Sequence, residues 1–364
     1  MSTPILGVRY TRTFNDPVWR ALGRPPLLAD RGLLVLGEYV PGVGTAGVIE
    51  GISLTNVEAN ASGIISLSVP DTVHSNKMFW GEVQCTAPGQ EFENCWVAGR
   101  DPDLITAATT NCVKSYGASI YHSTWTDCTI DPSPWQTQRG KQIKATLGFQ
   151  GGNFTFRRGE IKNVEDCVSH LGHDVMAGEA STYTHQTVIE QSWLHKTFYD
   201  NGDHVARSDK RLHSDVIQLQ TGKNITIRGN MLGGARDMTG YRTWPNGYNS
   251  GDDGWNAAIQ IAQAVSTDAS AQIENVLIEK NFIAGGTSGI NHGYQTTRPN
   301  TFSTTVIKDN KFFTRGTGWG TSANGVGTYD SGNGYYIIRS TSLASTYTGN
   351  TIYETGAAVP INNG

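Results

Sequence analysis

A short sequence phrase returns several times in the C-terminal half of the chain. Residues 222–230 (GKNITIRGN) are echoed by residues 274–281 (ENVLIEKN) and by residues 304–310 (TTVIKDN). Each copy alternates apolar and polar residues, which predicts a strand rather than a helix. A strand motif repeated along a chain predicts a solenoid in which each coil adds one rung and loops bulge outward.

Each copy also carries an asparagine three positions after an apolar residue. These asparagines are Asn230, Asn281 and Asn310, and Asn350 follows Tyr347 at the same offset. In stacked coils, an inward amide can hydrogen-bond the amides above and below it. Asparagine also favours turns on its own, but four copies at one offset favour a ladder.

Related strands extend this pattern towards the N-terminus. Residues 154–161 and 188–194 fit the same register, and residues 51–57 resemble a first rung. Cys95 and Cys128 occupy equivalent positions in two matching rungs, 33 residues apart. The repeats therefore predict one elongated solenoid domain over residues 45–364, so the usual relation between length and domain number does not apply.

Composition agrees with an all-β, loop-rich protein. Gly accounts for 43 of 364 residues, and only 16% of residues are charged. A net charge of −4 offers no basic patch for nucleic acid. The sequence has neither an apolar run long enough for a membrane span nor a signal peptide at its start. We therefore expect synthesis in a cytoplasm.

The five cysteines argue against a disulfide framework, because their number is odd and no C-x-x-C pair suits zinc. Cys95, Cys128 and Cys167 are interpreted as small apolar residues in the interior. The sequence predicts no cofactor and no metal site.

Residues 1–44 do not follow the repeat. Their Trp and Leu residues are interrupted by prolines, and so short a segment must pack its apolar side chains on something else. We expect it to cap the open end of the solenoid or to attach it to other proteins of an assembly. The C-terminus offers no obvious cap, which favours an oligomer, most simply a homotrimer.

Several rungs resemble a known family. Residues 211–230 are similar to the H-x-D-x-I-Q and G-x-N-I-x-I-x-x-N stretch of pectate-lyase-like right-handed parallel β-helix proteins from phages of actinobacteria. Residues 153–158 and 163–170 resemble two further rungs of those proteins, although Gly-Gly stands before Asn153 where the family has His. The resemblance covers roughly residues 85–310. It implies an all-β, single-stranded right-handed parallel β-helix and a minor tail or other virion-associated protein.

The densest set of titratable residues lies in the middle of the chain. Asp166 and Asp215 precede apolar stretches in consecutive large rungs, and His213 and Asp209 lie close to Asp215 in sequence. Two carboxylates on neighbouring coils are the arrangement that a glycosidase uses. The structural alternative is that each Asp accepts backbone N–H groups at a strand corner. The sequence leaves both interpretations open.

A long loop adds aromatic residues that suit sugar rings. Tyr241, Trp244, Tyr248 and Trp255, with Arg211, are the predicted glycan-binding residues. The same region holds Asp237, Asp252 and Asp253, whose oxygens suit calcium, but their spacing fits no known calcium loop.

Two functions of different classes follow. The first is a structural virion protein, a tail spike or minor tail protein, that contacts other virion proteins through residues 1–44 and binds a host cell-surface polysaccharide. The second is a polysaccharide depolymerase, a hydrolase rather than a lyase, with Asp166, Asp209, His213 and Asp215 as its catalytic residues.

Overall fold

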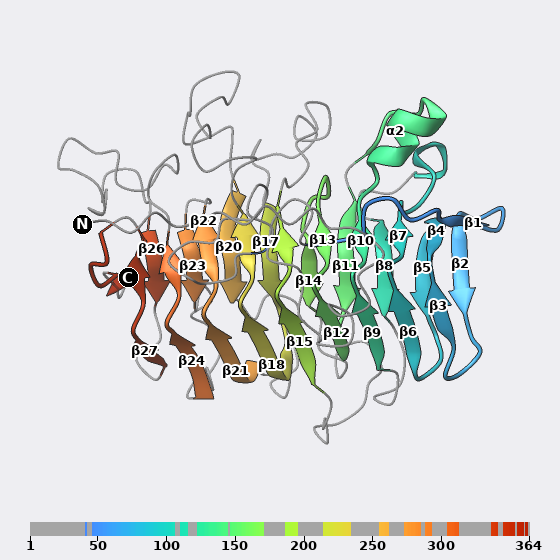
Figure 1. The fold of residues 1–364 in the computed structure, drawn as a ribbon. Helices are drawn as coiled ribbons and strands as arrows, with labels where there is room; N and C mark the ends of the chain where they lie inside the picture. The colour runs from blue at the N-terminus through green and yellow to red at the C-terminus, as the bar shows by residue number, and fades with distance from the viewer. Residues whose placement is uncertain are drawn as a thin grey trace, which may run out of the picture.

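The computed structural model describes residues 41, 46–105, 110–115, 122–144, 146–170, 186–195, 214–233, 255–261, 273–284, 288–292, 304–312, 336–340, 345–353, 355–359 and 361–362. Within them the chain winds repeatedly through three parallel sheets of ten, ten and nine strands (Figure 1). The predicted parallel β-helix is thus confirmed. Residues 1–44, apart from residue 41, lie outside the described residues.

Each coil of the solenoid adds one strand to each sheet, in the order sheet 1, sheet 2, sheet 3. Sheet 1 contains β1 (Thr55–Glu58), β4 (Lys77–Trp80), β7 (Trp96–Val97), β10 (Thr129–Ile130), β13 (Glu160–Ile161), β16 (Trp193–Leu194), β19 (Met231–Gly233), β22 (Phe282–Ala284), β25 (Lys311–Phe312) and β28 (Thr351–Ile352).

Sheet 2 contains β2 (Ile64–Leu67), β5 (Glu82–Cys85), β8 (Asn111–Ser115), β11 (Leu147–Gly151), β14 (Val168–His170), β17 (Ser214–Leu219), β20 (Trp255–Ile261), β23 (Ser288–His292), β26 (Tyr336–Ser340) and β29 (Ile361–Asn362). Sheet 3 contains β3 (Val73–Ser75), β6 (Gln90–Glu93), β9 (Ser123–Thr126), β12 (Phe154–Arg157), β15 (Thr187–Glu190), β18 (Gly222–Arg228), β21 (Ile273–Glu279), β24 (Thr305–Lys308) and β27 (Thr346–Thr348).

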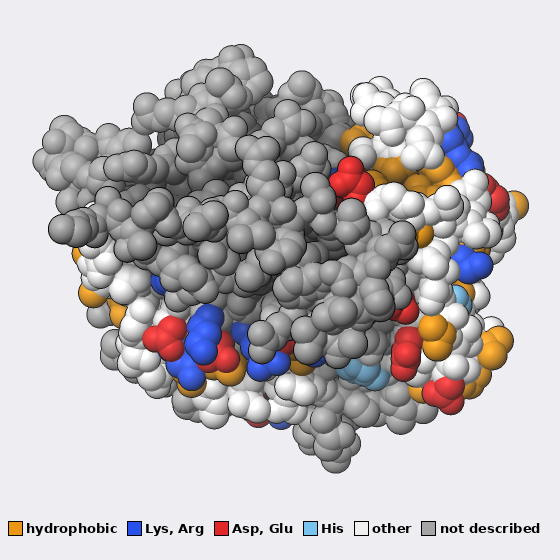
Figure 2. Space-filling view, in the orientation of Figure 1, with side chains coloured by type: hydrophobic (Ala, Val, Ile, Leu, Met, Phe, Trp, Pro, Cys, Tyr) orange, Lys and Arg blue, Asp and Glu red, His pale blue; other side chains and the backbone are white. Residues whose placement is uncertain are grey.

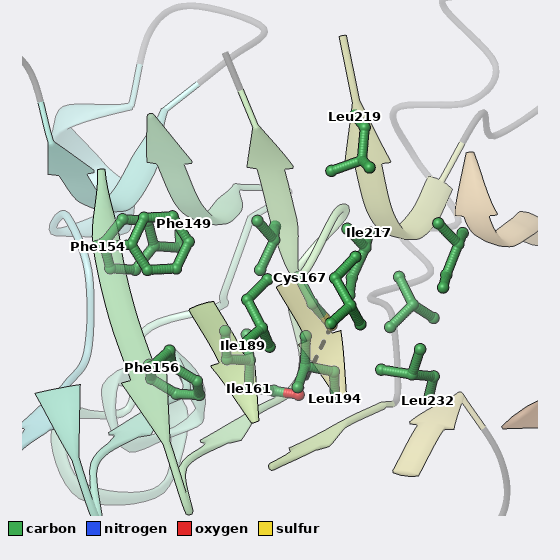
Figure 3. Packing of buried hydrophobic residues seen from close by; sticks show 14 of the residues in the cluster. Phe149, Phe154, Phe156, Ile161, Cys167, Ile189, Leu194, Ile217, Leu219 and Leu232 are labelled. Atoms are coloured by element: carbon green, nitrogen blue, oxygen red, sulfur yellow. Dashed lines mark hydrogen bonds between the residues drawn. The ribbon is translucent and has the colours of Figure 1, made fainter. Parts of the chain in front are cut away.

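The core is a set of side-chain rows that run along the solenoid axis. Alternate residues of each strand point inward, and the parallel register stacks each of them on its equivalent in the next coil. In sheet 3 one such row is aromatic at first, with Phe92 stacked on Trp125 at 3.5 Å between ring centroids. It continues as isoleucines in the later coils, from Ile189 onward (Figure 3). Because one face of each strand packs on this continuous core, apolar and polar residues alternate along the strands.

The corner between sheet 3 and sheet 1 has the same length in most coils. Two residues form this corner, and the first of them has a left-handed backbone conformation. Examples are Asn94 (φ 57°), Arg158 (φ 51°) and Lys280 (φ 54°). The next residue then points inward, directly before the first strand residue of sheet 1. We call these inward residues the corner ladder: Cys95, Cys128, Gly159, Ser192, Asn230, Asn281, Asn310 and Asn350.

The predicted asparagine ladder is confirmed. Side-chain amides pass hydrogen bonds from coil to coil, with Asn230 Nδ2 donating to Asn281 Oδ1 (3.0 Å), Asn281 Nδ2 to Asn310 Oδ1 (2.9 Å) and Asn310 Nδ2 to Asn350 Oδ1 (2.9 Å). Each amide oxygen also accepts the backbone N–H of the preceding ladder residue. The buried corner thereby satisfies its polar groups without water.

Residues 46–49, here called the strap, run across the outer face of sheet 1 instead of forming a coil. Ala46 packs with Trp193, Met231 and Phe282. Three strap N–H groups then bond successive coils in reverse order: Gly47 to Arg158 O, Val48 to Thr129 Oγ1 and Ile49 to Asn94 Oδ1, each at 2.8 Å. The strap therefore ties several coils together along the side of the solenoid.

A short helix covers the early part of sheet 1. Helix α2 (Ser133–Arg139) ends at Gly140 in the left-handed conformation, and it stands out from the solenoid in Figure 1. Trp135 packs edge-on against Trp80 at 5.0 Å between centroids and donates from Nε1 to Gly99 O (3.1 Å). A 3₁₀ turn, η1 (Pro102–Leu104), lies one coil earlier, and Asp101 before it pairs with Lys141 after the helix at 2.6 Å. No helix among the described residues is long and apolar enough to cross a membrane.

The outer face of sheet 3 carries alternating charges. Glu190 is buried between Arg157 and Arg228 of the neighbouring coils, and Lys308 pairs with Glu279 at 3.2 Å. Acidic and basic side chains lie next to one another along the lower edge of the molecule in Figure 2. This face is balanced in charge, as the low net charge of the chain leads one to expect.

Candidate functional site

Asp166 and Asp215 occupy the same position in consecutive coils of sheet 2. Asp166 Oδ1 accepts the backbone N–H of Asp215 (2.7 Å), and Asp215 Oδ1 accepts the backbone N–H of Ala257 (2.8 Å). Asp215 is fully buried and lies two residues before the core residue Ile217, on the inward side of β17. These contacts are those of the structural alternative, in which each carboxylate receives a backbone N–H at a strand corner. Catalysis by this pair stays a prediction.

His170 follows Asp166 but bonds elsewhere. Its Nδ1–H donates to Thr221 O (2.7 Å), and its Nε2 accepts from the hydroxyl of Thr187 (3.0 Å). Burial lowers the pKa of His170 to about 4, so the ring is neutral near pH 7. Gly222 packs on this ring, because a Cβ there would meet His170 Cε1 at 2.5 Å. His170 therefore holds the corner between sheets 2 and 3.

The remaining predicted site residues lie outside the described residues, apart from the backbone of Trp255. His213, Asp209, Arg211, Tyr241, Trp244 and Tyr248 lie outside the described residues, as do the calcium candidates Asp237, Asp252 and Asp253. Trp255 begins β20, but only its backbone is described. Among the described residues, no group of three or more His, Cys, Asp or Glu side chains could hold a metal ion.

The outer face of sheet 2 carries a feature that sequence reasoning recognised only in part. One polar residue per coil stands in register over seven coils, between inward residues that form the core. We call this the polar row: Gln84, Lys114, Gln150, Ser169, Gln218, Gln260 and Asn291. The repeated Ile-Gln pairs at 217–218 and 259–260 were its signal in the sequence.

The polar row is rich in side-chain amides that bond one another along the axis. Asn291 Nδ2 donates to Gln260 Oε1 of the preceding coil (2.9 Å). Gln220, which follows β17 and is not a member of the row, donates from Nε2 to Gln218 Oε1 in its own coil and to Ser169 Oγ of the preceding coil (3.3 Å). Within the described residues, Asn291 Oδ1 and Gln220 Oε1 accept no hydrogen bond although both are buried.

Exposure along the polar row is uneven. Gln84, Lys114, Gln150 and Gln218 are half-buried, whereas Ser169, Gln260 and Asn291 are buried. The half-buried members lie mostly in the earlier coils, on the side of β5, β8 and β11. A ligand reaching this face would therefore meet the amides of those coils first.

A second polar cluster lies beneath the strap on sheet 1. Glu160 accepts a hydrogen bond from His195 Nε2 (2.9 Å) and pairs with Lys162 (2.8 Å), while Trp193 stacks on His195 at 3.6 Å. Burial raises the pKa of Glu160, but the hydrogen bond from His195 and the charge of Lys162 outweigh it and leave that pKa below its usual value. Gly47 closes over Glu160, so we interpret this cluster as an anchor for the strap.

Comparison with known proteins gives no match: no family model, no curated protein and no solved structure is detectably similar to the chain. The family resemblance over roughly residues 85–310 therefore stays an expectation that rests on the motifs themselves.

Proposed function

We propose that this protein is a structural component of a phage particle, a β-helical tail spike or minor tail protein, that binds a polysaccharide of the host surface. The virion setting rests on the family resemblance of the rungs. The glycan-binding role is supported chiefly by one observation, the polar row on sheet 2.

The polar row suits a linear carbohydrate lying along the solenoid axis. Adjacent parallel strands are about 4.8 Å apart, so the row offers one hydrogen-bonding side chain at each such step. Amides both donate and accept, as a polymer of hydroxyl groups requires. Lys114 is the single charged residue among these seven, and the next residue in the same register after Asn291 is Arg339. The side-chain amides that predominate between the two cations favour an uncharged glycan over a polyuronate.

Equilibrium binding to a panel of linear polysaccharides, some uncharged and some containing uronates, tests the proposal. We expect an uncharged polymer to bind wild type, and Gln150→Ala and Gln218→Ala each to weaken its Kd about 2- to 10-fold through one lost hydrogen bond. Thr226→Ala, on the outer face of sheet 3, is the matched control and should bind like wild type. Equal binding by all variants would remove the polar row as the site.

The same mixtures of protein and polysaccharide also test whether the protein is a depolymerase. Release of reducing ends by wild type but not by Asp215→Asn would make the protein a hydrolase and would return Asp215 to the catalytic residues. Binding without release supports the structural protein, in which Asp215 serves the corner of β17.

Assembly is the second part of the proposal. Residues 1–44 join the protein to other virion proteins, and the β-helix forms a homotrimer. Support comes from the apolar, proline-interrupted sequence of that segment. Sedimentation of the full chain should give three times the monomer mass of 39.4 kDa; a monomer at micromolar concentration would contradict this part alone.

A further inference from the structure

The corner ladder changes its chemistry along the solenoid. Its later coils use asparagine, whose amides bond both the previous and the next coil. The middle coils use Ser192, whose Oγ accepts the N–H of Gly159 (3.0 Å), and Gly159 itself, where a Cβ would meet the Phe156 ring. The two earliest ladder positions that face each other carry thiols, Cys95 and Cys128. The amide chain thus stops before it reaches the N-terminal coils.

Cys95 and Cys128 are direct neighbours across two coils. The strand residues that follow them, Trp96 and Thr129, are paired in parallel register, and the Thr129 N–H donates to Cys95 O (2.8 Å). Neighbouring parallel strands lie about 4.8 Å apart, within the range of about 4.4–6.8 Å between Cα atoms that a disulfide spans. Both side chains are fully buried in the core, where the Cys95 Sγ lies 3.2 Å from His74 O and the Cys128 Sγ lies 3.3 Å from Thr126 O.

The other three cysteines have different neighbours. The Cys85 thiol bonds Ser123 and the Cys112 thiol bonds Thr146. The Cys167 Sγ lies 3.6 Å from Ile161 O and 3.9 Å from His195 O. Within the described structure, Cys95 and Cys128 are therefore the pair arranged for a bond between sulfurs.

We propose that Cys95 and Cys128 form a reversible disulfide that staples two consecutive coils when the chain folds in oxidising surroundings. The reaction is thiol–disulfide exchange with a small disulfide such as oxidised glutathione. The Cys95 thiolate attacks one sulfur of the oxidant, which gives a mixed disulfide and one reduced glutathione. The Cys128 thiolate then attacks the Cys95 sulfur and releases the second glutathione, so two protein thiols are oxidised and one glutathione disulfide is reduced.

Cys95 is the better first nucleophile of the pair. The hydrogen bond from Cys128 lowers the pKa of Cys95, whereas burial raises the pKa of Cys128 well above its usual value. In a reducing cytoplasm both thiols stay free. Closure of the bond would give the N-terminal coils a covalent link where the amide ladder is missing.

Refolding of the full chain tests the disulfide, because both thiols are accessible until their coils close. The chain is refolded from denaturant either in a glutathione redox buffer or with excess reductant. Intact mass and peptide mapping without reduction should then show a Cys95–Cys128 link in the oxidised sample, with free thiols falling from five to three. The oxidised protein should melt several degrees higher, and added reductant should reverse the shift.

Variants separate this pair from adventitious oxidation. Cys85→Ser should still form the link, whereas Cys95→Ser should keep all of its remaining thiols and show no oxidant-dependent change in melting. Should Cys95→Ser fail to fold, peptide mapping of the wild type decides alone. Five free thiols in a natively folded, oxidised sample, or a link between any other two cysteines, would overturn the proposal.

Discussion

At the scale of single residues, the corner between sheets 3 and 1 explains the repeated asparagine. The amides of Asn281 and Asn310 each have four polar partners: amides of the two adjacent coils, a backbone N–H and a backbone carbonyl. A buried side chain with that many partners is costly to remove, because its neighbours are left without bonds in a place that water does not enter.

Asn281→Ala tests that corner. The substitution leaves Ile227 O and the Asn230 N–H without their side-chain partner, and we expect a loss of about 1–3 kcal/mol in the free energy of unfolding. Chemical denaturation of both proteins measures it, with Thr226→Ala as a half-buried control on the outer face of an adjacent coil. If Asn281→Ala and wild type have the same free energy of unfolding, this ladder amide contributes nothing to stability.

Because of His170, the free energy of unfolding depends on pH below neutrality. Its pKa of about 4 in the folded protein lies below the unfolded value of about 6.5. The unfolded chain therefore binds a proton first as pH falls, and folding loses stability from about pH 6.5 down to pH 4, by about 3 kcal/mol in total. Above pH 6.5 this stability is fully present.

Melting temperatures at pH 7 and pH 4.5 check this linkage. We expect the drop between the two pH values to be smaller in His170→Gln than in wild type, even if the variant melts lower at pH 7. His292, whose pKa burial also lowers to about 4, contributes a second, separate drop. An unchanged drop in His170→Gln would show that the acid sensitivity resides elsewhere.

At the scale of elements, helix α2 is an addition to the solenoid rather than one of its coils. Its Trp135 is the buried contact to sheet 1, and Arg139 stacks over Trp80 at 3.7 Å. Among the described residues, no strand forms a backbone hydrogen bond with helix α2. The helix should therefore be able to detach while the sheets stay folded.

Trp135→Ala should detach helix α2 while the sheets stay intact. The lost burial is on the order of 3–5 kcal/mol, enough to undock so short a helix. Hydrogen exchange should then show faster exchange over residues 131–144 and unchanged protection of β10 and β13. Faster exchange in those strands as well would mean that the helix is part of the cooperative unit.

The elements also mark what sequence alone could predict. The asparagine ladder, the equivalence of Cys95 and Cys128 and the parallel sheets follow from a pattern that each coil repeats. The strap left no such signal, because its bonds join residues far apart in sequence, such as Gly47 and Arg158, and occur once. The role of Asp215 was also undecidable, since a carboxylate that receives a backbone N–H and one that acts on a substrate look alike in sequence.

At the scale of the whole molecule, the solenoid is held along its length by two devices, the inner ladder and the outer strap. The strap depends on Gly47, which adopts φ +84° and passes so close to sheet 1 that a Cβ would meet Thr129 Oγ1 at 2.5 Å and Glu160 Cβ at 2.9 Å. Glycine is suited to this position because it adopts a positive φ without strain and has no Cβ to collide with sheet 1.

Gly47→Val should therefore release the strap without unfolding the coils. Limited proteolysis should cut the variant near residues 46–50 at protease concentrations that leave wild type intact, while the circular dichroism of the strands is retained. Gly51→Val is the matched control, since Gly51 also has a positive φ (+86°) but no neighbouring atom within 4 Å. Equal cleavage of Gly47→Val and wild type would show that the strap is held by other contacts.

The corners of this molecule differ in how freely they can grow. Between sheets 3 and 1 the spacing is kept by the ladder, whereas between sheets 1 and 2 the chain needs only residues 162–167 in one coil but 195–213 in the next and 234–254 in the one after. Insertions on that side leave the stacking undisturbed. The length and sequence of these connections can therefore change from coil to coil while the strands of sheet 2 keep their parallel register.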